Sequence, residues 1–447
     1  MVRDMTEGKP LSLILHFCIP MLVGNLFQQL YNMVDSVVVG RFVGQDALAA
    51  VGSTGSISFL VIGFVTGCTS GFAIPVAQTF GAGDYSEMRK HVANAMYLSI
   101  LISAVLTTLT MIFTRPLLEL MNTPENIIDS AYDYIIVIFG GIAVTMLYNI
   151  LASVLRALGD SKTPLLFLAV ASVLNIILDL LFVMGFKLEC LGVGFATVIA
   201  QAISAVLCLI YIKKRYPILT FSKDELRVNK ACSGRLLSVG LPMAFQFSIT
   251  AVGSIILQTA VNSLGSGIVA AVTIANKIQM IVTQPMETMG VTLATYGGQN
   301  LGAGRIDRVK KGISQSLIVI LIYSIAAFAV VTLLGEYIAM LFIKPEEMAV
   351  MDEVKQFLFC NGMFYPILAI LFVLRNSLQG LGFGLLPMLA GVCELVARTV
   401  IAFMLVGTFG YTAICFASPA AWVAADILLA VIYFIKMKEL TLKYKKA

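Results

Sequence analysis

Two aspartates, Asp35 and Asp179, stand inside apolar runs of the sequence that are long enough to cross a membrane. An ionised carboxylate at the middle of a bilayer costs about 3 kcal/mol on insertion scales, so it rarely lies there without a partner or a purpose. Neither aspartate has a lysine or an arginine within one helical turn of it in the sequence. These two carboxylates are therefore the first candidates for chemistry inside the membrane.

Amide and hydroxyl side chains lie close to both carboxylates in the sequence. Asn175 precedes Asp179 by one turn on the same helical face, and Thr197 follows on the next apolar run. The run that contains Asp35 also carries Gln28, Tyr31 and Asn32. Their oxygens suit Na⁺ when the acids are ionised, whereas burial disfavours the charged form and lets the same acids bind a proton. We interpret the group as a coupling-ion site, with a buried structural network as the open alternative.

Other ionisable residues also fall inside apolar runs. Glu394 and Arg398 are spaced one turn apart, where opposite charges on a helix meet, and we expect a structural ion pair there. Arg375 lies close to the cytoplasmic end of its run, and we expect its long side chain to snorkel to the membrane interface. Substrate contact, cavity hydration and packing all stay open for the remaining residues, Lys277, Glu287 and Asp426.

Membrane-spanning helices must hold these residues, because the 447-residue chain is 59% hydrophobic and only 12% charged. A soluble protein carries about 25% charged residues. Apolar stretches of about 20 residues recur along the chain, and each can cross the hydrocarbon core as a helix. We therefore expect an all-α polytopic membrane protein with about twelve spans. They are predicted near 11–40, 50–80, 91–114, 130–157, 163–186, 192–213, 235–262, 268–300, 312–334, 354–378, 385–408 and 413–436.

The distribution of charge predicts how these spans are oriented. Most lysines and arginines fall at the two ends of the chain, in the 214–234 segment and in the other loops of the same side, whereas the opposite loops are acidic. Positively charged loops stay in the cytoplasm. We expect a multi-pass protein of the plasma membrane with both termini cytoplasmic. The first span has no small-residue cleavage site behind it, so we expect it to be retained.

The chain contains an internal duplication. The stretch AQTFGAGDYSEMRKHV at 77–92 matches GQNLGAGRIDRVKKGI at 298–313, and LRALGDSKTP at 155–164 matches LQGLGFGLLP at 378–387. Both pairs have nearly the same offset in the sequence, so the two halves have the same six-span topology. Parallel repeats of this kind are related by an axis along the membrane normal and are typical of alternating-access transporters.

The duplication predicts the domain organisation. We expect an N-terminal bundle at 1–213, a basic cytoplasmic linker at 214–234 and a C-terminal bundle at 235–447. The equivalents of Asp35 and Asp179 in the second half are Leu257 and Ala402. The two carboxylates therefore belong to the N-terminal bundle alone, which argues against a packing role that both halves would share.

The sequence gives little support to an enzyme or a metalloprotein. The eight cysteines are scattered without a CxxC or Cys/His spacing, which indicates neither a disulfide framework nor a metal site apart from Na⁺ at the coupling site. No GxSxG, HExxH or Walker motif occurs, and the GAGD and GAGR patterns read as turns at helix ends. We expect a secondary transporter without a cofactor, driven by H⁺ or Na⁺.

Over essentially its whole length the chain resembles the multidrug and toxic compound extrusion (MATE) transporters. The resemblance rests on IPMLVGNLFQQLYNMVDSVVVGRFVGQDALAAVG, on QTFGAGD with its partner QNLGAGR, and on LRALGDSKTPLLFLAVASVLNIILDLLFV. It implies two six-helix bundles arranged in a V and antiport of organic, often cationic and aromatic, drugs against H⁺ or Na⁺. It also implies a monomer in the lipid bilayer with small-molecule partners and no nucleic acid.

Within that family the chain resembles the branch whose cation site lies in the N-terminal lobe. The resemblance implies Asp35, Asn175, Asp179 and Thr197 as ligands and adds Tyr134 and Asn149 on the fourth span. The other branch places acids on the seventh and tenth spans, and this chain departs from it: the seventh has Gln246, and the tenth has no acid. Neutral or attractive contacts in a second-lobe cavity are then left to Gln246, Gln284 and Glu287.

Together these observations lead to the hypothesis of a secondary active multidrug exporter with Asp35 and Asp179 as coupling carboxylates. The alternative is a flippase for a lipid-linked oligosaccharide or a cell-wall precursor. Such a flippase needs several cations in its cavity for the pyrophosphate, and the candidates are Lys277, Arg375 and Arg398, all in the second half. The sequence leaves the choice of drug and of ion undecided.

Overall fold

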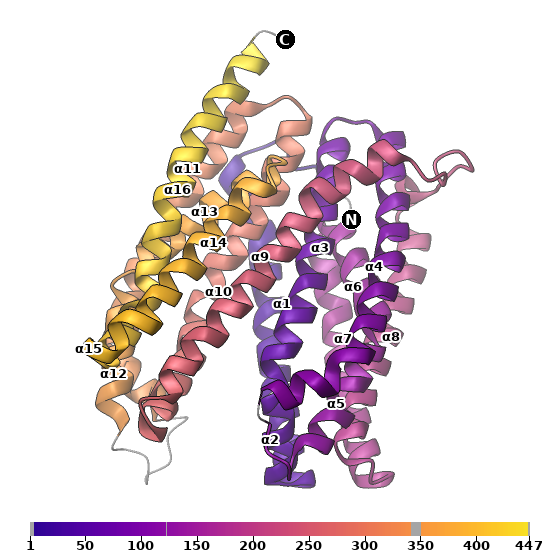
Figure 1. Cartoon of the computed structure of the whole chain (residues 1–447). Helices are drawn as coiled ribbons and strands as arrows, with labels where there is room; N and C mark the ends of the chain where they lie inside the picture. The colour runs from indigo at the N-terminus through magenta and orange to yellow at the C-terminus, as the bar shows by residue number, and fades with distance from the viewer. Residues whose placement is uncertain (1–3, 122, 341–349, 446–447) are drawn as a thin grey trace. The chain divides into compact units, whose positions relative to one another are not determined.

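The computed structural model describes residues 4–121, 123–340 and 350–445, without the side chains of 30–33, 35–37 and 445. The regular elements of these residues are helices (Figure 1). In the first half they are α1 (Pro10–Val38), α2 (Gln45–Ser53), α3 (Gly55–Gly81), α4 (Tyr85–Leu120), α5 (Ile128–Gly140), α6 (Ile142–Ala157), α7 (Lys162–Leu180) and α8 (Glu189–Arg215). In the second half they are α9 (Lys230–Asn262), α10 (Ser266–Gly302), α11 (Ile306–Ala339), α12 (Met351–Gly362), α13 (Tyr365–Gly380), α14 (Leu385–Val400), α15 (Val406–Phe409) and α16 (Tyr411–Lys445).

The apolar helices confirm the predicted fold class. In the described part of the chain, 10 helices are long and apolar enough to cross a membrane, and the number rises to 12 if each of two bent pairs forms one span. The bent pairs are α5 with α6, at 49°, and α12 with α13, at 50°. Pro366 in the first turn of α13 accounts for the second break, since a proline has no N–H to donate to the carbonyl four residues earlier, that of Gly362, where α12 ends.

Local structure repeats along with the sequence. Gly83 and Gly304, the last residues of the two GAG turns, have φ of 73° and 72°. Each closes the end of its helix with the same hydrogen bond, from Gly83 N to Phe80 O and from Gly304 N to Leu301 O, both at 3.0 Å. Glycine is used here because only it adopts positive φ without strain. The equal turns and the two bent pairs show that both halves follow one local plan.

The chain folds into two compact units. The first contains Ile19–Ala244, and the second contains Met5–Cys18 together with Phe245–Ala447. The boundaries between them fall inside α1 and inside α9, the first long helix of each half, and each boundary is close to a proline, Pro20 or Pro242. Helices therefore connect the units directly.

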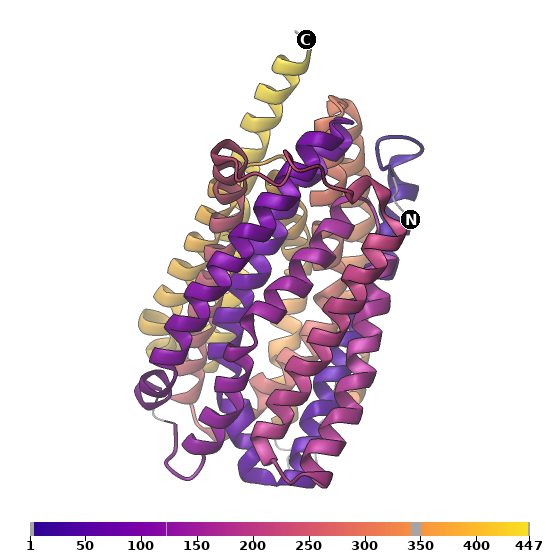
Figure 2. The same ribbon diagram turned by 90° about the vertical axis from the view of Figure 1, so that its right-hand side faces the viewer.

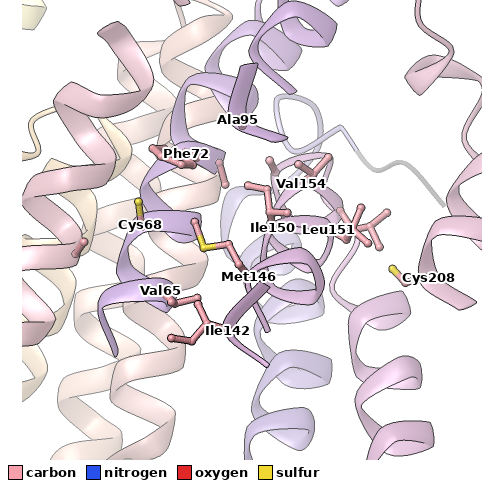
Figure 3. Close-up of a cluster of buried hydrophobic side chains, with 14 of the residues drawn as sticks. Val65, Cys68, Phe72, Ala95, Ile142, Met146, Ile150, Leu151, Val154 and Cys208 are labelled. Atoms are coloured by element: carbon pink, nitrogen blue, oxygen red, sulfur yellow. The ribbon is translucent and has the colours of Figure 1, made fainter. Parts of the chain in front are cut away.

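The core of the first unit lies between α3, α4 and α6, which contact one another (the same helices are seen from another side in Figure 2). Figure 3 shows side chains of α3 meeting those of α6, with Val65, Cys68 and Phe72 beside Ile142 and Met146. All five are buried. This apolar packing leaves the opposite face of α6 available to polar residues, which line the cavity described next.

Candidate functional site

A cavity inside the first unit brings together four of the polar residues singled out in the sequence. It has room of about 180 Å³ for water-sized molecules and is bounded by α1, α3, α6, α7 and α8. Gln28, Asn149, Asn175 and Thr197 all line it. Four residues from four different helices, chosen from sequence alone, thus share one space.

A hydrogen bond between two residues that line the cavity joins α7 to α8. Asn175 is buried, and its Nδ2 donates to the Thr197 hydroxyl at 3.3 Å. The same hydroxyl donates to the carbonyl of Val193 at 3.1 Å. The backbone of α8 therefore fixes the orientation of Thr197, and Thr197 in turn accepts from Asn175.

A second polar group lies on α6. Thr145 donates to Gln201 of α8 at 2.7 Å, and Asn149 donates to the carbonyl of Thr145 at 2.9 Å. Tyr148 donates to the carbonyl of Pro164 at the start of α7, at 3.2 Å. All five residues line the cavity. The wall is therefore held in place by bonds that join α6 to both α7 and α8.

Asp179 lies one turn beyond Asn175 on α7 and is fully buried. The helix widens directly after it into a π turn at Leu181–Gly185. Such single wide turns inside helices are frequent at functional sites. Asp179 does not line the cavity itself but follows the cavity residue Asn175 by one turn of α7.

Three predicted residues of α1 lie outside the described residues as far as their side chains are concerned. These are Asp35, Tyr31 and Asn32, whose backbone forms part of α1. The prediction that Asp35 pairs with Asp179 therefore stays a prediction.

Tyr134 does not line the cavity. It packs against a small apolar cluster that includes Val39, one turn after position 35, and Val183, one turn after Asp179. Its carbonyl oxygen also abuts α8 at Gly194, where an added Cβ would lie 3.1 Å from it. Tyr134 is thus next to the π turns at Val39–Val43 and Leu181–Gly185, which follow the helices that carry the two aspartates.

Arg156 is a cavity residue that the sequence did not single out. It stands in the last turn of α6, lines the cavity and donates from Nη2 to the Ser153 hydroxyl at 2.8 Å. In the sequence it reads as one of many basic residues at the cytoplasmic end of a span. No local pattern marks it, because only the packing of α6 turns it inward.

The second unit holds the other predicted polar residues in two places. Gln379 of α13 donates to Gln246 of α9 at 2.6 Å, and both are buried. Gln284 donates to Glu287 one turn along α10 at 3.4 Å. Gln246 is therefore engaged by a neighbour within its own unit.

A buried group of charges in the second unit corrects one expectation. Arg375 does not snorkel to an interface: it is 7% exposed and pairs with Glu394 of α14. The expected pair between Glu394 and Arg398 is confirmed, at 3.4 Å. Asp426 of α16 is buried as well, and neither of its carboxylate oxygens has a hydrogen-bond partner among the described residues. The span end was placed correctly, but a carboxylate on another helix holds Arg375 inside.

Comparisons with known proteins agree with this architecture. The family model described as MatE matches the chain twice, at residues 20–181 and 242–404. The "Probable multidrug resistance protein YoeA" of Bacillus subtilis is 32% identical over 66% of this chain and 65% of its own length. The "Probable multidrug resistance protein YpnP" of the same organism is 28% identical over 85% of this chain and 84% of its own length.

One solved structure of similar fold is described as an outward-facing conformation of a multidrug resistance MATE family transporter. It is 20% identical, has a TM-score of 0.91 and covers 98% of each chain. The double match of the family model falls on the two halves that the repeated stretches define in the sequence.

Proposed function

The chain belongs to the MatE family of membrane transporters, and on this basis we propose that it exports organic compounds in exchange for H⁺ or Na⁺ bound at Asp35 and Asp179. The substrate class we infer is aromatic and often cationic drugs, so that the protein would confer resistance to them. Membership of this family establishes that the chain is a multi-pass transporter of the cell membrane. What we propose beyond this is the identity of the coupling ion, of the coupling residues and of the substrates.

The observation that carries the proposal is the polar cavity of the first unit. Asn175, Thr197 and Asn149 line it, and the buried Asp179 follows Asn175 by one turn along α7. A carboxylate held beside amide and hydroxyl oxygens can accept a proton or coordinate Na⁺. Moving one charge through 100 mV is worth about 2.3 kcal/mol, which is enough to drive substrate against a gradient.

The mechanism we infer uses α1 as the moving part. Loading the carboxylates with H⁺ or Na⁺ removes their charge, and α1 rearranges and closes the cavity of the first unit, so that bound substrate leaves to the outside. Two features support this: α1 contributes Gln28 to the cavity wall, and it contains Pro20 within its length. A proline inside a helix removes one backbone hydrogen bond and favours bending there.

We also propose that both termini and the segment between α8 and α9 face the cytoplasm, as the basic side chains of that segment indicate. We favour the exporter over the flippase alternative, because two of the three cations that the flippase would use for a pyrophosphate, Arg375 and Arg398, are buried and share the carboxylate of Glu394.

The test is transport in vesicles that contain the purified full-length protein. A fluorescent aromatic cation is followed while a pH step or a Na⁺ step is imposed alone. We expect Asp35→Asn and Asp179→Asn to abolish gradient-driven movement while the protein still inserts. Asp133→Asn is the matched control, because Asp133 lies on α5 in the same unit but is only half-buried and is not a predicted ion ligand, whereas Asp179 is fully buried. Normal movement in both Asn variants of the candidate site would refute the proposed coupling carboxylates.

A further inference from the structure

Three potential metal ligands lie close together where α4 and α9 begin, and none of them lines the cavity. They are Glu87 and His91, on the first two turns of α4, and Cys232 on the first turn of α9. One ligand atom from each lies within 4.8 Å of the other two. We propose that these three side chains bind a transition-metal ion of the Zn²⁺ class.

The imidazole of His91 is prepared to act as a ligand. Its Nδ1 lies 2.9 Å from the carbonyl oxygen of Glu87, and because a carbonyl only accepts, Nδ1 carries the proton. Nε2 therefore presents its lone pair, and it is buried without a hydrogen-bond partner in the described part of the chain. The side chain is only 1% exposed. A histidine whose other nitrogen donates to a carbonyl is the usual arrangement behind a metal ligand.

The thiol and the carboxylate complete the set. The Cys232 Sγ donates to Glu87 Oε1 at 3.2 Å, so sulfur and oxygen already face each other. A metal ion would take the place of that thiol proton, which is released to solvent, and bind the resulting thiolate. A divalent ion with one thiolate, one carboxylate and one neutral imidazole is electrically neutral, which favours its burial. The fourth tetrahedral position is left for water.

The ligand chemistry selects the class of ion. Thiolate and imidazole prefer Zn²⁺ and related ions such as Co²⁺ and Cd²⁺, whereas Mg²⁺ and Ca²⁺ require mainly oxygen ligands. Two cations lie close by. Lys90 contacts the second carboxylate oxygen, Glu87 Oε2, at 3.2 Å, and Arg235 is engaged with Gln78 at 2.7 Å. Lys90 therefore fixes Glu87 in position while Oε1 remains directed at the thiol.

The site is also preorganised, because the start of α9 is fastened to α4 by other bonds. Asn229 accepts from the backbone N–H groups of Ala231 and Cys232, at 2.9 and 3.2 Å, and caps α9. Asn94 of α4 accepts from the N–H of Asn229 at 2.8 Å and from the Ser233 hydroxyl at 3.1 Å. A metal ion would add a further link between these helices without requiring the backbone to move.

No local motif in the sequence marks this group. Glu87 and His91 are one turn apart, but Cys232 lies 145 positions from Glu87. The expectation of no Cys/His metal site rests on ligand spacing along the sequence, whereas the proposed site is formed by the packing of α4 and α9.

The test is Co²⁺ titration of the purified full-length protein in detergent, with excess Mg²⁺ present. We expect a thiolate-to-cobalt charge-transfer band, visible bands of tetrahedral Co²⁺, and displacement of both by Zn²⁺. Cys232→Ser should abolish the charge-transfer band, and His91→Gln should weaken binding by roughly tenfold or more. Cys393→Ser is the matched control and should bind like the wild-type protein, since Cys393 lies in α14 of the other unit.

Thermal melting of each variant without metal shows whether it is folded, and Glu87→Gln provides a second ligand variant that keeps the side-chain shape. The absence of a charge-transfer band in the folded wild-type protein would overturn the proposal. A band that persists in Cys232→Ser would do so too, because the thiolate would then come from another cysteine. The function proposed above requires no transition-metal ion, so this experiment is independent of the vesicle assay.

Discussion

Asn175 and Thr197 join α7 to α8 through a single hydrogen bond, from Nδ2 to the hydroxyl, at 3.3 Å. Thr197 can accept this bond because its own proton goes to the Val193 carbonyl. The hydroxyl is therefore oriented before any ion arrives, and its removal should affect the ion site more than the fold.

The first prediction concerns this hydroxyl. Thr197→Val keeps the shape of the side chain but removes the acceptor, so the hydrogen bond from Asn175 to position 197 is lost at a cost of about 0.5–1.5 kcal/mol. We expect the ion concentration for half-maximal efflux to rise by up to roughly tenfold. Thr197→Ser keeps the hydroxyl and should behave like the wild-type protein. Vesicle transport over a range of Na⁺ or H⁺ concentrations measures both, and equal behaviour of Val and Ser variants would contradict a role of the hydroxyl.

The second prediction concerns Asp160, in the turn between α6 and α7. It accepts from Thr163 Oγ1 at 2.6 Å and from the backbone N–H groups of Lys162 and Thr163 at 2.9 and 3.0 Å, and Tyr216 also donates to it. Burial alone would raise the pKa of Asp160, but these hydrogen bonds outweigh it, and the pKa lies below its ordinary value. A lowered folded-state pKa stabilises the fold above the unfolded-state pKa of about 3.9.

We therefore expect Asp160→Asn to lower the melting temperature most at neutral pH, through a loss of about 1–3 kcal/mol. The deficit relative to the wild-type protein should shrink as the pH falls below about 4, because the unfolded wild-type chain then binds a proton that the folded carboxylate, with its lower pKa, does not yet bind; the deficit disappears once the pH falls below the folded-state pKa. Melting of both proteins in detergent across this pH range measures it. A deficit that is independent of pH would show that the charge of Asp160 is not what stabilises the turn.

The third prediction concerns the connection between α8 and α9. Glu225 accepts from Arg89 Nε and Nη2, both at 2.8 Å, and from Ser86 at 2.9 Å. The Arg89 guanidinium holds the pKa of Glu225 well below its usual range. Since Tyr97 also donates to the carbonyl of Leu226 at 2.8 Å, the segment is docked on α4. Glu225→Gln should expose it to chymotrypsin and speed cleavage there several-fold.

The neighbouring Asp224 provides the control for this experiment. Its salt bridge to Arg227, at 3.2 Å, is fully at the surface, with both side chains more than four-fifths exposed. Exposed pairs of this kind contribute little to stability. Asp224→Asn should leave the rate of cleavage unchanged, and equal acceleration by both substitutions would mean that docking does not depend on Glu225.

The fourth prediction concerns the approach of α3 to α9 in the first unit. A Cβ added to Gly71 would lie 2.5 Å from Cα of Gly240, so one of the two backbones would have to shift. Overpacking of this kind costs about 1–3 kcal/mol, and we expect Gly71→Ala to lower the melting temperature. Gly234→Ala, also in a helix but with open space around the new Cβ, should be neutral or stabilising by up to about 1 kcal/mol. Similar melting of both variants would contradict the close approach.

The fifth prediction concerns the shared carboxylate of the second unit. Glu394→Gln leaves Arg375 and Arg398 buried without their counter-ion, which costs about 3–5 kcal/mol when one partner of a buried pair is removed. We expect a large loss of folded protein on extraction into detergent. Asp426→Asn should cost less than about 1 kcal/mol, because it removes a buried carboxylate without hydrogen-bond partners. A larger loss for Asp426→Asn would mean that its charge balances the second arginine.

The features that the sequence predicted best are those that depend on short stretches of residues. Spans follow from runs of about 20 apolar residues, so all the predicted spans have helical counterparts. The sequence did not predict the bends between α5 and α6 and between α12 and α13, since hydropathy carries no information on the direction of a helix axis. Both GAG turns were read correctly, because glycine pairs at helix ends carry a local conformational signal.

Residues whose roles depend on distant partners were predicted less well. Arg375 was expected at an interface because its partner Glu394 is on another helix. Arg156 was counted as a loop cation, although it turns into the cavity. Asn149, Asn175 and Thr197 line one cavity, and the family resemblance and the spacing of α7 had grouped them. Tyr134 does not line this cavity, and its role at the ion site stays a prediction, as do the roles of the other three.

The division of α1 between the two units has a consequence for biosynthesis. Residues of the Met5–Cys18 segment bond to the end of α10 and the start of α11, from Met5 N to Gln299 at 2.8 Å and from Arg308 to the carbonyl of Gly8 at 2.8 Å. The ribosome makes these partners almost 300 residues later, which at about 5–20 residues per second is a delay of about 15–60 s. The start of α1 can therefore reach its final partners only after the ribosome has synthesised the chain through α10.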